Sequence, residues 1–364
     1  MTLNISAPST SARERVYQAL KQGSATRPEL AKRTGLSGVA VITAVEELQQ
    51  ARLAALEDTP LPGSRGRPAT QVRLLLEEAR ITALDLGGAQ VSTGAFNLLG
   101  ERLGSALHGP PQQQISEDPA QNVAWLADLL QRQGQAHQSV IGVLGRVDPE
   151  TRRVTSRPLK LQDHPLEQEL SERLGWPVRV ENDANLSAWH HWKVLNLRPS
   201  DPLVFLNFSF NIGLGMVLGG QVYSGARGAA GEIQYAADPN RTNPTEMMGL
   251  RLLGHLQWLS PNGSTADVAL MGHQGHRAAQ RALQRFNQDL AVHLTSVMAV
   301  LAPRVLVLQD VPLASELLRD EVRFTFAELG FDTRVMISPL GPMAGLVSAG
   351  VYGVKVLERT RLGL

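Results

Sequence analysis

Three short stretches of the sequence carry residue types that could bind or transform a ligand. A strand-like segment, ITALDLGG, ends in Asp85 and the glycines Gly87 and Gly88. A second segment, WPVRVENDAN, ends in a polar run that contains Asn182 and Asp183. Carboxylate and amide groups offer paired hydrogen-bond acceptors and donors, which suit a polyhydroxyl ligand. The third stretch, SRGRP, is positively charged and suits a polyanion.

The basic stretch comprises Arg65, Gly66, Arg67 and Pro68, and we interpret it as a linker. A narrow A·T-rich minor groove has an enhanced negative potential that attracts inserted arginines. Gly66 permits a close approach of the backbone to the groove floor, and Pro68 disfavours helical dihedrals at Arg67. The four residues resemble the core of the AT-hook motif, which has this function. The alternative is a flexible, soluble hinge.

The segment before this stretch has the pattern of three short helices. They begin near STSARERV, ATRPELAK and LSGVAVIT and are about 13, 8 and 14 residues long. Thr26 and Glu29 have the spacing of a capping box, Gly35 ends the second helix, and Ser37 caps the third. The third helix is expected to bury an apolar stripe of Val41, Val45 and Leu48, widened by Ile42.

This order is the helix-turn-helix plan, in which the third helix enters a DNA major groove. Residues 53–56 and 71–76 are expected to form the two strands of a wing. The positions that would face DNA carry no long side chain with a hydrogen-bond donor. Val39 and Ala40 could therefore contact only thymine methyl groups among the base edges. A bundle that binds protein is the alternative. The expected DNA-facing positions of the third helix are Ser37, Gly38, Val39, Ala40 and Thr43.

Charge is distributed unevenly along the 364 residues, although the total is only +1. Residues 1–75 contain ten Lys and Arg against six Asp and Glu, a net charge of +4, and the remainder contains 25 against 28, a net charge of −3. A small basic module attached to a nearly neutral body points to nucleic acid.

The composition excludes several classes of protein. The sequence contains no cysteine, which excludes disulfides and thiolate metal sites. We find no apolar run of the ~18 residues that a membrane span needs and no signal-peptide pattern. We therefore expect a cytoplasmic protein with no membrane contact.

After residue 75, apolar strand-like segments alternate with helical patterns, which indicates an α/β body. The ordered motifs DLGG, GRVDPET, ENDAN, IGLGMVLGGQVYSGARGAAGEI and the final AGL-SAG helix are similar to those of the ROK family, roughly from Ala12 to Val356. The resemblance implies a winged helix-turn-helix followed by a two-lobed actin/hexokinase-like (ribonuclease H-like) body. We expect a DNA-binding domain at 1–75, a first lobe at 76–190 with the helix 343–360, and a second lobe at 191–342.

The family includes sugar kinases, and the resemblance assigns kinase elements to several residues. Asp183 matches the catalytic base, and Asp85, Gly87 and Gly88 match the first phosphate loop. The second phosphate loop, however, reads Ser209-Phe210-Asn211 where the family has glycines, and Gln309-Asp310 replaces a Gly-Gly pair near adenosine. Bulky Phe210 would obstruct backbone N–H groups from reaching phosphate. We therefore expect a vestigial nucleotide site, no cofactor and no kinase activity.

The resemblance also implies a sugar pocket. Asn182, Asp183 and Glu232 match residues that hold sugar hydroxyls, and Glu246 matches a further one. Tyr235 replaces the histidine that usually joins this pocket. The family's zinc motif is missing, so we expect no metal. The pairs His190-His191 and His273/His276 are more typical of packing or surface residues than of metal ligands. The alternative is that Asp183 caps the helix near Ala184 and Glu232 is a satisfied buried carboxylate.

The predicted function is a DNA-binding transcriptional regulator of the repressor branch that senses a sugar or related molecule. A homodimer or dimer of dimers would match two DNA half-sites. Two alternatives remain open: a sugar kinase with an appended DNA-binding module, and a constitutive regulator without an effector.

Overall fold

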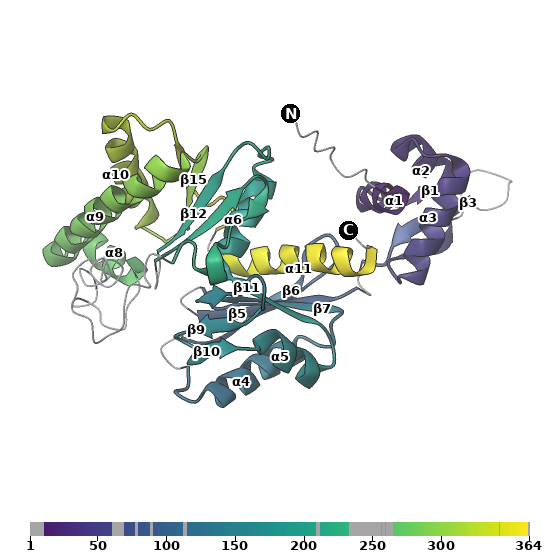
Figure 1. Ribbon diagram of the computed structural model, residues 1–364, viewed down its shortest axis with the longest axis horizontal. Helices are drawn as coiled ribbons and strands as arrows, with labels where there is room; N and C mark the ends of the chain where they lie inside the picture. The colour runs from purple at the N-terminus through teal and green to yellow at the C-terminus, as the bar shows by residue number, and fades with distance from the viewer. Residues whose placement is uncertain are drawn as a thin grey trace.

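The computed structural model describes residues 11–59, 69–76, 79–87, 90–111, 115–208, 212–232, 256, 259, 265–341 and 343–362. Three groups of elements follow one another along the longest axis (Figure 1). An N-terminal module lies at one end, a first lobe with a five-stranded sheet lies in the middle, and a second lobe with another five-stranded sheet lies at the far end.

The N-terminal module contains the three expected helices and both wing strands. Its elements are α1 (Ala12–Lys21), β1 (Ala25–Thr26), α2 (Arg27–Thr34), α3 (Gly38–Gln50), β2 (Ala54–Thr59) and β3 (Ala69–Leu74). The predicted capping box of Thr26 and Glu29 forms, and Gly35 ends α2 in the left-handed conformation with φ 65°. The short strand β1 pairs with β3 and was not predicted.

Ile42 corrects one sequence prediction about α3. Val41, Val45 and Leu48 are fully buried, as expected, but 42% of Ile42 is exposed. The helix turns 100° per residue, which places Ile42 on the side away from the stripe that packs on α1. Ile42 therefore belongs to the outer face of α3 rather than to the core of the module.

The basic stretch at residues 65–68 lies outside the described residues. The strands on either side of it, β2 and β3, pair with each other in antiparallel register from Ala54↔Leu74 to Thr59↔Ala69. The stretch therefore connects the two wing strands, which lie close to the predicted residues 53–56 and 71–76.

The first lobe is built on a sheet with the strand order β11-β7-β4-β5-β6. Its central strand, β4, is parallel to β7 and antiparallel to β5. The outer strands continue these directions, β11 parallel to β7 and β6 antiparallel to β5. The strands are β4 (Ile81–Asp85), β5 (Gln90–Phe96), β6 (Arg102–Pro111), β7 (Gln138–Val143) and β11 (Val178–Asn182).

The second lobe repeats this topology with the order β14-β13-β12-β15-β16. Its central strand, β12, is parallel to β15 and antiparallel to β13. The outer strands again continue these directions as far as β14 and β16. The strands are β12 (Leu203–Asn207), β13 (Gly213–Leu218), β14 (Gln221–Val222), β15 (Val305–Leu308) and β16 (Arg334–Ile337). The α/β body is thus two-lobed, as predicted.

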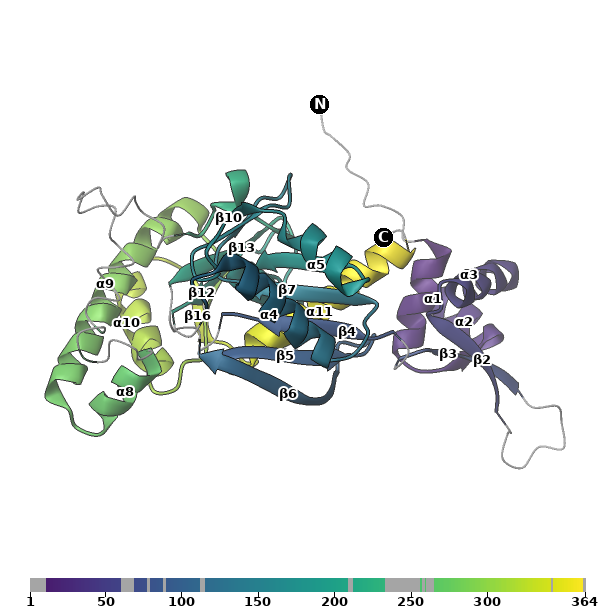
Figure 2. The same cartoon turned by 90° about the horizontal axis from the view of Figure 1, so that it is seen from below.

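Two helices lie between the sheets: α6 (Asp183–Val194) and α11 (Ala344–Leu362). Helix α11 packs on β4 and β7, α6 packs on β12 and β13, and the two helices pack on each other. Figure 2 shows α4 (Pro119–Arg132) and α5 (Leu166–Leu174) on the other side of the first sheet. The second lobe adds α8 (Thr265–His273), α9 (Arg277–Leu301) and α10 (Ser315–Glu328).

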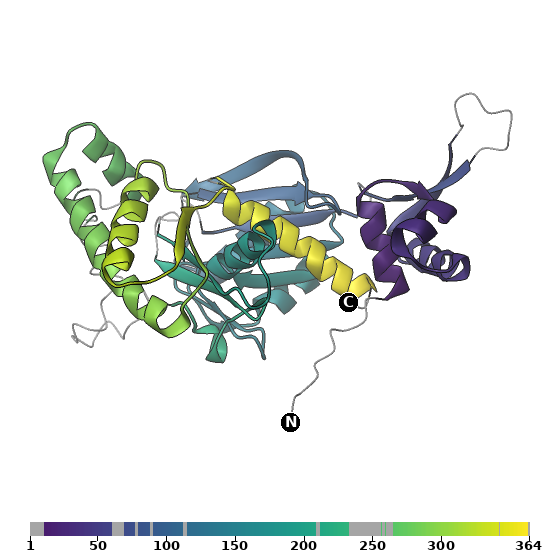
Figure 3. The same cartoon turned by 90° about the horizontal axis from the view of Figure 1, so that it is seen from above.

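A continuous apolar core joins the module to the first lobe. Val16 of α1 and Leu48 of α3 belong to the same buried cluster as Ile81 of β4 and Leu357 of α11. Figure 3 shows α11 running from between the lobes to the module. Because the module is packed against the body, a displacement of α11 would also move the module. Within the part of the chain that the structure describes, no helix is long and apolar enough to cross a membrane.

Candidate effector site and nucleic-acid interface

A polar centre forms where β4, α6 and α11 meet. Asp85 ends β4 and Asp183 begins α6, and both are buried. A Cβ atom on Gly87 would lie 2.5 Å from Oδ2 of Asp183, and a Cβ atom on Gly345 of α11 would collide with the Asp85 carboxylate. The two glycines therefore let the backbone approach the carboxylates closely.

Each carboxylate is held by a backbone or amide donor. The N–H of Gly87 donates to Oδ1 of Asp85 at 3.0 Å. Asn207, at the end of β12, donates from Nδ2 to Oδ2 of Asp183 at 2.8 Å and so links the second lobe to α6. Sequence reasoning missed Asn207, because nothing local distinguishes it from any polar residue at a strand end.

Burial changes the proton affinity of all three predicted carboxylates. Burial raises the pKa of Asp183 to about 8, and the nearby negative charge of Asp85 raises it too. Burial likewise raises the pKa of Asp85 to about 6 and that of Glu232 to about 7. Because its pKa lies above neutral pH, the Asp183 carboxyl keeps a proton there and can both donate to and accept from ligand hydroxyls.

Asn182 makes contacts on both sides of this centre. Its Oδ1 accepts from the N–H of Asn185 at 2.9 Å, and its Nδ2 donates to the carbonyl of Gly145 at 3.0 Å and to Oε1 of Glu232 at 3.3 Å. Asn182 is thus the N-cap of α6, so the alternative that gave this role to Asp183 was wrong. The structure brings Asn182, Asp183 and Glu232 together; Glu246 and Gly88 lie outside the described residues.

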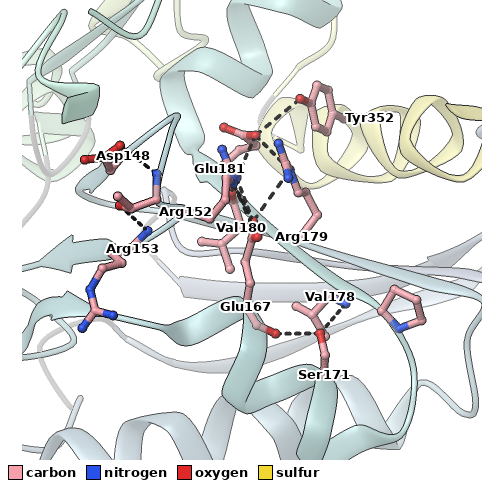
Figure 4. Close-up of polar contacts among 12 residues, drawn as sticks. Asp148, Arg152, Arg153, Glu167, Ser171, Val178, Arg179, Val180, Glu181 and Tyr352 are labelled. Atoms are coloured by element: carbon pink, nitrogen blue, oxygen red, sulfur yellow. Dashed lines mark hydrogen bonds and ion pairs between the residues drawn. The ribbon is translucent and has the colours of Figure 1, made fainter. Parts of the chain in front are cut away.

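A network of ion pairs supports the strand that presents Asn182 and Asp183 (Figure 4). Arg152 contacts Oε1 of Glu167 at 2.7 Å and Oε1 of Glu181 at 3.0 Å. Arg179 contacts Glu181 at 3.3 Å, and the hydroxyl of Tyr352 on α11 donates to the same oxygen at 3.4 Å. The network ties β11 to α5 and α11, which fixes where the polar centre lies.

The outer face of α3 is the candidate nucleic-acid interface. Val39 is 76% exposed, Thr43 is exposed, and Ala40 is half-buried. Gly38 is exposed with no atom near its Cβ position. Ser37 is exposed and caps the helix, with Oγ accepting from the N–H of Ala40 at 3.2 Å. Of the predicted DNA-facing residues in α3, Val39 and Thr43 therefore have side chains free to contact a partner.

Comparison with known proteins agrees with this architecture. Residues 81–240 match the model of the ROK family. This chain carries a ROK family domain. Over 353 residues, which cover 90% of both chains, it is 23% identical to the xylose repressor of Bacillus subtilis. Over 240 residues it is 29% identical to the bifunctional enzyme NanE/NanK of Brucella melitensis, and it spans 44% of that protein's length.

Solved structures show the same fold. A ROK family transcriptional regulator, described as a homologue of the E. coli MLC protein, superposes with a TM-score of 0.69 and 19% identity over 97% of this chain and 98% of that one. A ROK family glucokinase from Streptomyces griseus, in complex with glucose and AMPPNP, superposes with a TM-score of 0.60 and 19% identity over 76% of this chain and 99% of that one. The glucokinase structure thus aligns with about three quarters of this chain.

Gln309 directly follows β15 and belongs to the pair that replaces the family's Gly-Gly. Its side-chain Oε1 accepts from the backbone N–H of Phe208 at 3.2 Å. That N–H comes just before residues 209–211, the second phosphate loop of the sequence analysis, which lies outside the described residues. One backbone donor at the start of this loop is therefore used within the protein.

Three of the four histidines named in the sequence analysis have structural partners, namely His190, His191 and His276. His190 pairs with the Ser348 hydroxyl at 3.1 Å, and His191 pairs with the Ser338 hydroxyl at 2.8 Å. Burial lowers the pKa of His190 to about 4. Nδ1 of His276 accepts from the N–H of Ala279 and caps α9. In the ranges that the structure describes, no three His, Asp or Glu side chains are grouped as a metal site.

Helix α11 joins the two candidate sites, a feature with no signal in the sequence. Near its start, Gly345 lies against Asp85 of the polar centre. Near its end, Glu358 forms an ion pair with Lys21 of α1, and Arg361 donates to the carbonyl of Ala51 after α3 at 2.9 Å. These residues are more than 300 positions apart in the sequence, so only the fold brings them together.

Proposed function

We propose that this protein is a DNA-binding transcriptional repressor whose ROK body senses a sugar without phosphorylating it. The observation that carries the proposal is the path of α11 from the polar centre to the module. The nearly full-length similarity to the xylose repressor supports it, since that relative includes the N-terminal segment. We also propose the division into a DNA-binding domain and two lobes at the predicted boundaries.

The effector would bind at Asn182, Asp183 and Glu232. These side chains supply carboxyl and amide groups within one hydrogen-bonded cluster, in which Asn182 contacts Glu232 at 3.3 Å. A carboxyl that is protonated near neutral pH can donate to one sugar oxygen and accept from another hydroxyl. A site built to pair with hydroxyls discriminates strongly against analogues that lack them. The effector class is therefore a polyol such as a sugar.

Coupling to DNA would depend on a ligand that binds two arrangements of the lobes with different affinity. Asn207 of the second lobe holds Asp183, and Asp85 lies against α11 at Gly345. A sugar that replaces the Asn207–Asp183 hydrogen bond would change the position of the second lobe relative to α11. The movement would reach the module through Glu358 and Arg361, which contact it directly.

Loss of kinase activity is supported by the residues around the nucleotide side. Gln309 uses the Phe208 N–H, and Asp310, the next residue, would place a carboxylate near the phosphates of a nucleotide bound as the family resemblance implies. A carboxylate there would repel a nucleotide, because like charges at short range are unfavourable. The competing function, a sugar kinase with an appended module, is tested by a coupled assay with ATP, Mg²⁺ and a panel of sugars; turnover would establish it.

The wing connection would provide a second DNA contact. Arg65 and Arg67 are proposed to enter a minor groove beside the site that α3 occupies. Arg67→Ala is expected to weaken binding mainly on duplexes with A·T-rich flanks. An equal loss on G·C-rich flanks would make Arg67 a plain phosphate contact. A homodimer is proposed to place two modules on two half-sites.

The first experiment is fluorescence anisotropy of the full chain on a duplex from upstream of its own gene, against a scrambled duplex, at two salt concentrations. A preference that survives the higher salt would support a specific regulator, whereas equal and salt-sensitive binding would show only a basic module. Sugars are then added to the complex. A sugar that releases DNA must bind more weakly to the DNA complex than to free protein by the same factor.

Two variants separate sensing from DNA binding. Glu358→Gln and Arg361→Gln remove the contacts of α11 with the module but leave the polar centre intact. Both are expected to keep sugar binding, seen as a thermal shift, while the sugar's effect on DNA affinity falls. A protein that binds DNA specifically but shows no thermal shift with any sugar would be a constitutive regulator.

A further inference from the structure

The outer face of α3 has an unusual chemistry for a helix at this place in a helix-turn-helix. Val39 is 76% exposed and Ile42 is 42% exposed, and Thr43, which is also exposed, lies one turn after Val39 on the same side of the helix. The helix sequence, GVAVITAVEELQQ, contains no Lys, Arg, Asn or His. Direct readout of guanine or adenine by the usual bidentate donors is therefore not available to the first two turns.

These exposed groups match one feature of a base-pair edge. In the major groove, thymine alone presents a methyl group, and apolar side chains and the threonine methyl contact it. Val39 and Thr43 are separated by about 6 Å along the helix axis, at 1.5 Å per residue. Base pairs are stacked about 3.4 Å apart along each strand. The face therefore spans roughly two base-pair steps.

Charge around this face favours DNA as its occupant. Lys32 and Arg33 are exposed in the last turn of α2, which in this plan crosses the phosphate backbone next to the recognition helix. Glu46 is exposed one turn after Thr43 and would repel phosphate, so the contact is confined to the first half of α3. Two apolar side chains are far fewer than the 20–30 residues that each partner commonly contributes to a stable protein interface.

From these observations, and resting on the proposed DNA-binding function, we propose that α3 reads two or three consecutive thymine methyl groups in each half-site through Val39, Ile42 and Thr43. Specificity then comes from apolar contact in the major groove. The structure adds Ile42 to the predicted set and removes Ala40, which is half-buried.

The test removes single methyl groups from DNA. In a duplex that the full chain binds specifically, each thymine of the half-site is replaced in turn by deoxyuridine, which lacks only the 5-methyl group. Burial of one methyl-sized group contributes about 0.8 kcal/mol, which corresponds to about a fourfold change in affinity. We expect losses of about threefold to fivefold at two or three adjacent positions, and no loss at thymines outside the half-sites.

A protein variant assigns the contact to a side chain. Val39→Ala is expected to lower affinity for the thymine duplex about threefold to fivefold and to abolish the effect of deoxyuridine at one position. Val300→Ala is the matched control, because Val300 is 82% exposed on α9 of the second lobe. Both variants truncate an exposed valine in a helix, so neither is expected to impair folding.

Several outcomes would overturn the inference. Specific binding that is insensitive to every deoxyuridine would refute it and leave the proposed function standing. Val39→Ala with unchanged DNA affinity would make the face a vacant or protein-binding surface. Absence of specific binding to any duplex, including those selected from a random pool, would overturn the inference together with the proposed function.

Discussion

The two lobes share one strand topology but differ in the chemistry at equivalent strand ends. The central strand of the first lobe ends in Asp85, and the central strand of the second lobe ends in Asn207. After the next parallel strand, the second lobe has Gln309, whose amide is used to bind the Phe208 N–H. At these strand ends, the first lobe therefore carries a carboxylate and the second lobe carries amides.

This difference explains how buried carboxylates are tolerated at the centre. A carboxylate in place of Asn207 would repel Asp183 in a site shielded from water. The Asn207 amide instead donates to Asp183 at 2.8 Å, and the pKa of Asp183 is raised to about 8 mainly by burial. At this contact one lobe supplies the carboxyl group and the other supplies the hydrogen-bond donor, so the contact depends on both lobes being in place.

The lobes also differ in how their outer parallel strands are held. In the first lobe, Arg152 bridges Glu167 and Glu181 beside β11, and its side chain is only 21% exposed. In the second lobe, Arg304 and Asp332 beside β16 are 3.8 Å apart and largely exposed. The first pair is shielded and shared among several partners, and the second is open to water.

The largest expected effect comes from breaking the shielded network. Arg152→Met would leave Glu167 and Glu181 with only Arg179 as a common partner, at a cost of roughly 3 kcal/mol, the lower end of the range for breaking a buried ion pair. Arg304→Met is the matched control and should change stability by less than about 1 kcal/mol. Urea denaturation of both variants measures the difference. Equal losses would show that the two strands are held by packing alone.

Replacing a glycine of the polar centre with alanine should have the next largest effect on stability. Gly345→Ala places a Cβ atom on the Asp85 carboxylate, and Gly87→Ala places one 2.5 Å from Asp183. Each is expected to destabilise the protein by about 1–3 kcal/mol, although alanine favours a helix at position 345. Gly213→Ala in the second lobe meets no atom within 4 Å and should be nearly neutral. Thermal unfolding would reveal whether the lobes differ in this way.

Replacing the Asn207 amide with a carboxylate would give the central strands of both lobes the same chemical group at their ends. Asn207→Asp replaces the donor to Asp183 with a like charge and should cost about 1.5–3 kcal/mol at pH 8. The loss should be smaller at pH 5, where a protonated carboxyl can still donate. If the loss were the same at both pH values, charge repulsion would not be its cause.

The last prediction concerns the pH dependence of stability. The pKa of Asp183 is raised in the folded protein to about 8, above the value of about 3.9 in an unfolded chain. The folded state then binds the proton more tightly, so this group's contribution declines as the pH rises from about 4 to about 8. Asp183→Asn should flatten that decline, giving its largest relative gain near pH 8. A gain that is independent of pH would contradict the assignment.

Local signals predicted the N-terminal module well. The capping box at Thr26 and Glu29, the left-handed Gly35 and the Ser37 cap depend on neighbours within a few residues, and all three formed. The alternation of strands and helices likewise predicted the α/β body. The two wing strands also formed close to the predicted residues 53–56 and 71–76, and the basic stretch connects them.

The candidate site was predicted only in part. Order and motif placed Asn182, Asp183 and Glu232 in one pocket, and the structure brings them together. The capping role fell to Asn182, because the side chain one residue earlier has the geometry to reach the N–H of Asn185. Asn207, Arg152 and Tyr352 carried no local signal, since each acts through a partner far away in the sequence.

By itself, the sequence determined the helices and turns of the module, the alternating strands and the polar residues that end them. These features depend on backbone preferences and side-chain periodicity within about 20 residues. Only the tertiary structure decided which carboxylates share a proton-binding environment, that Ile42 lies outside the core, and that α11 connects the centre to the module. Desolvation, like-charge repulsion and packing depend on distances in space, and the chain sets those distances only when it is folded.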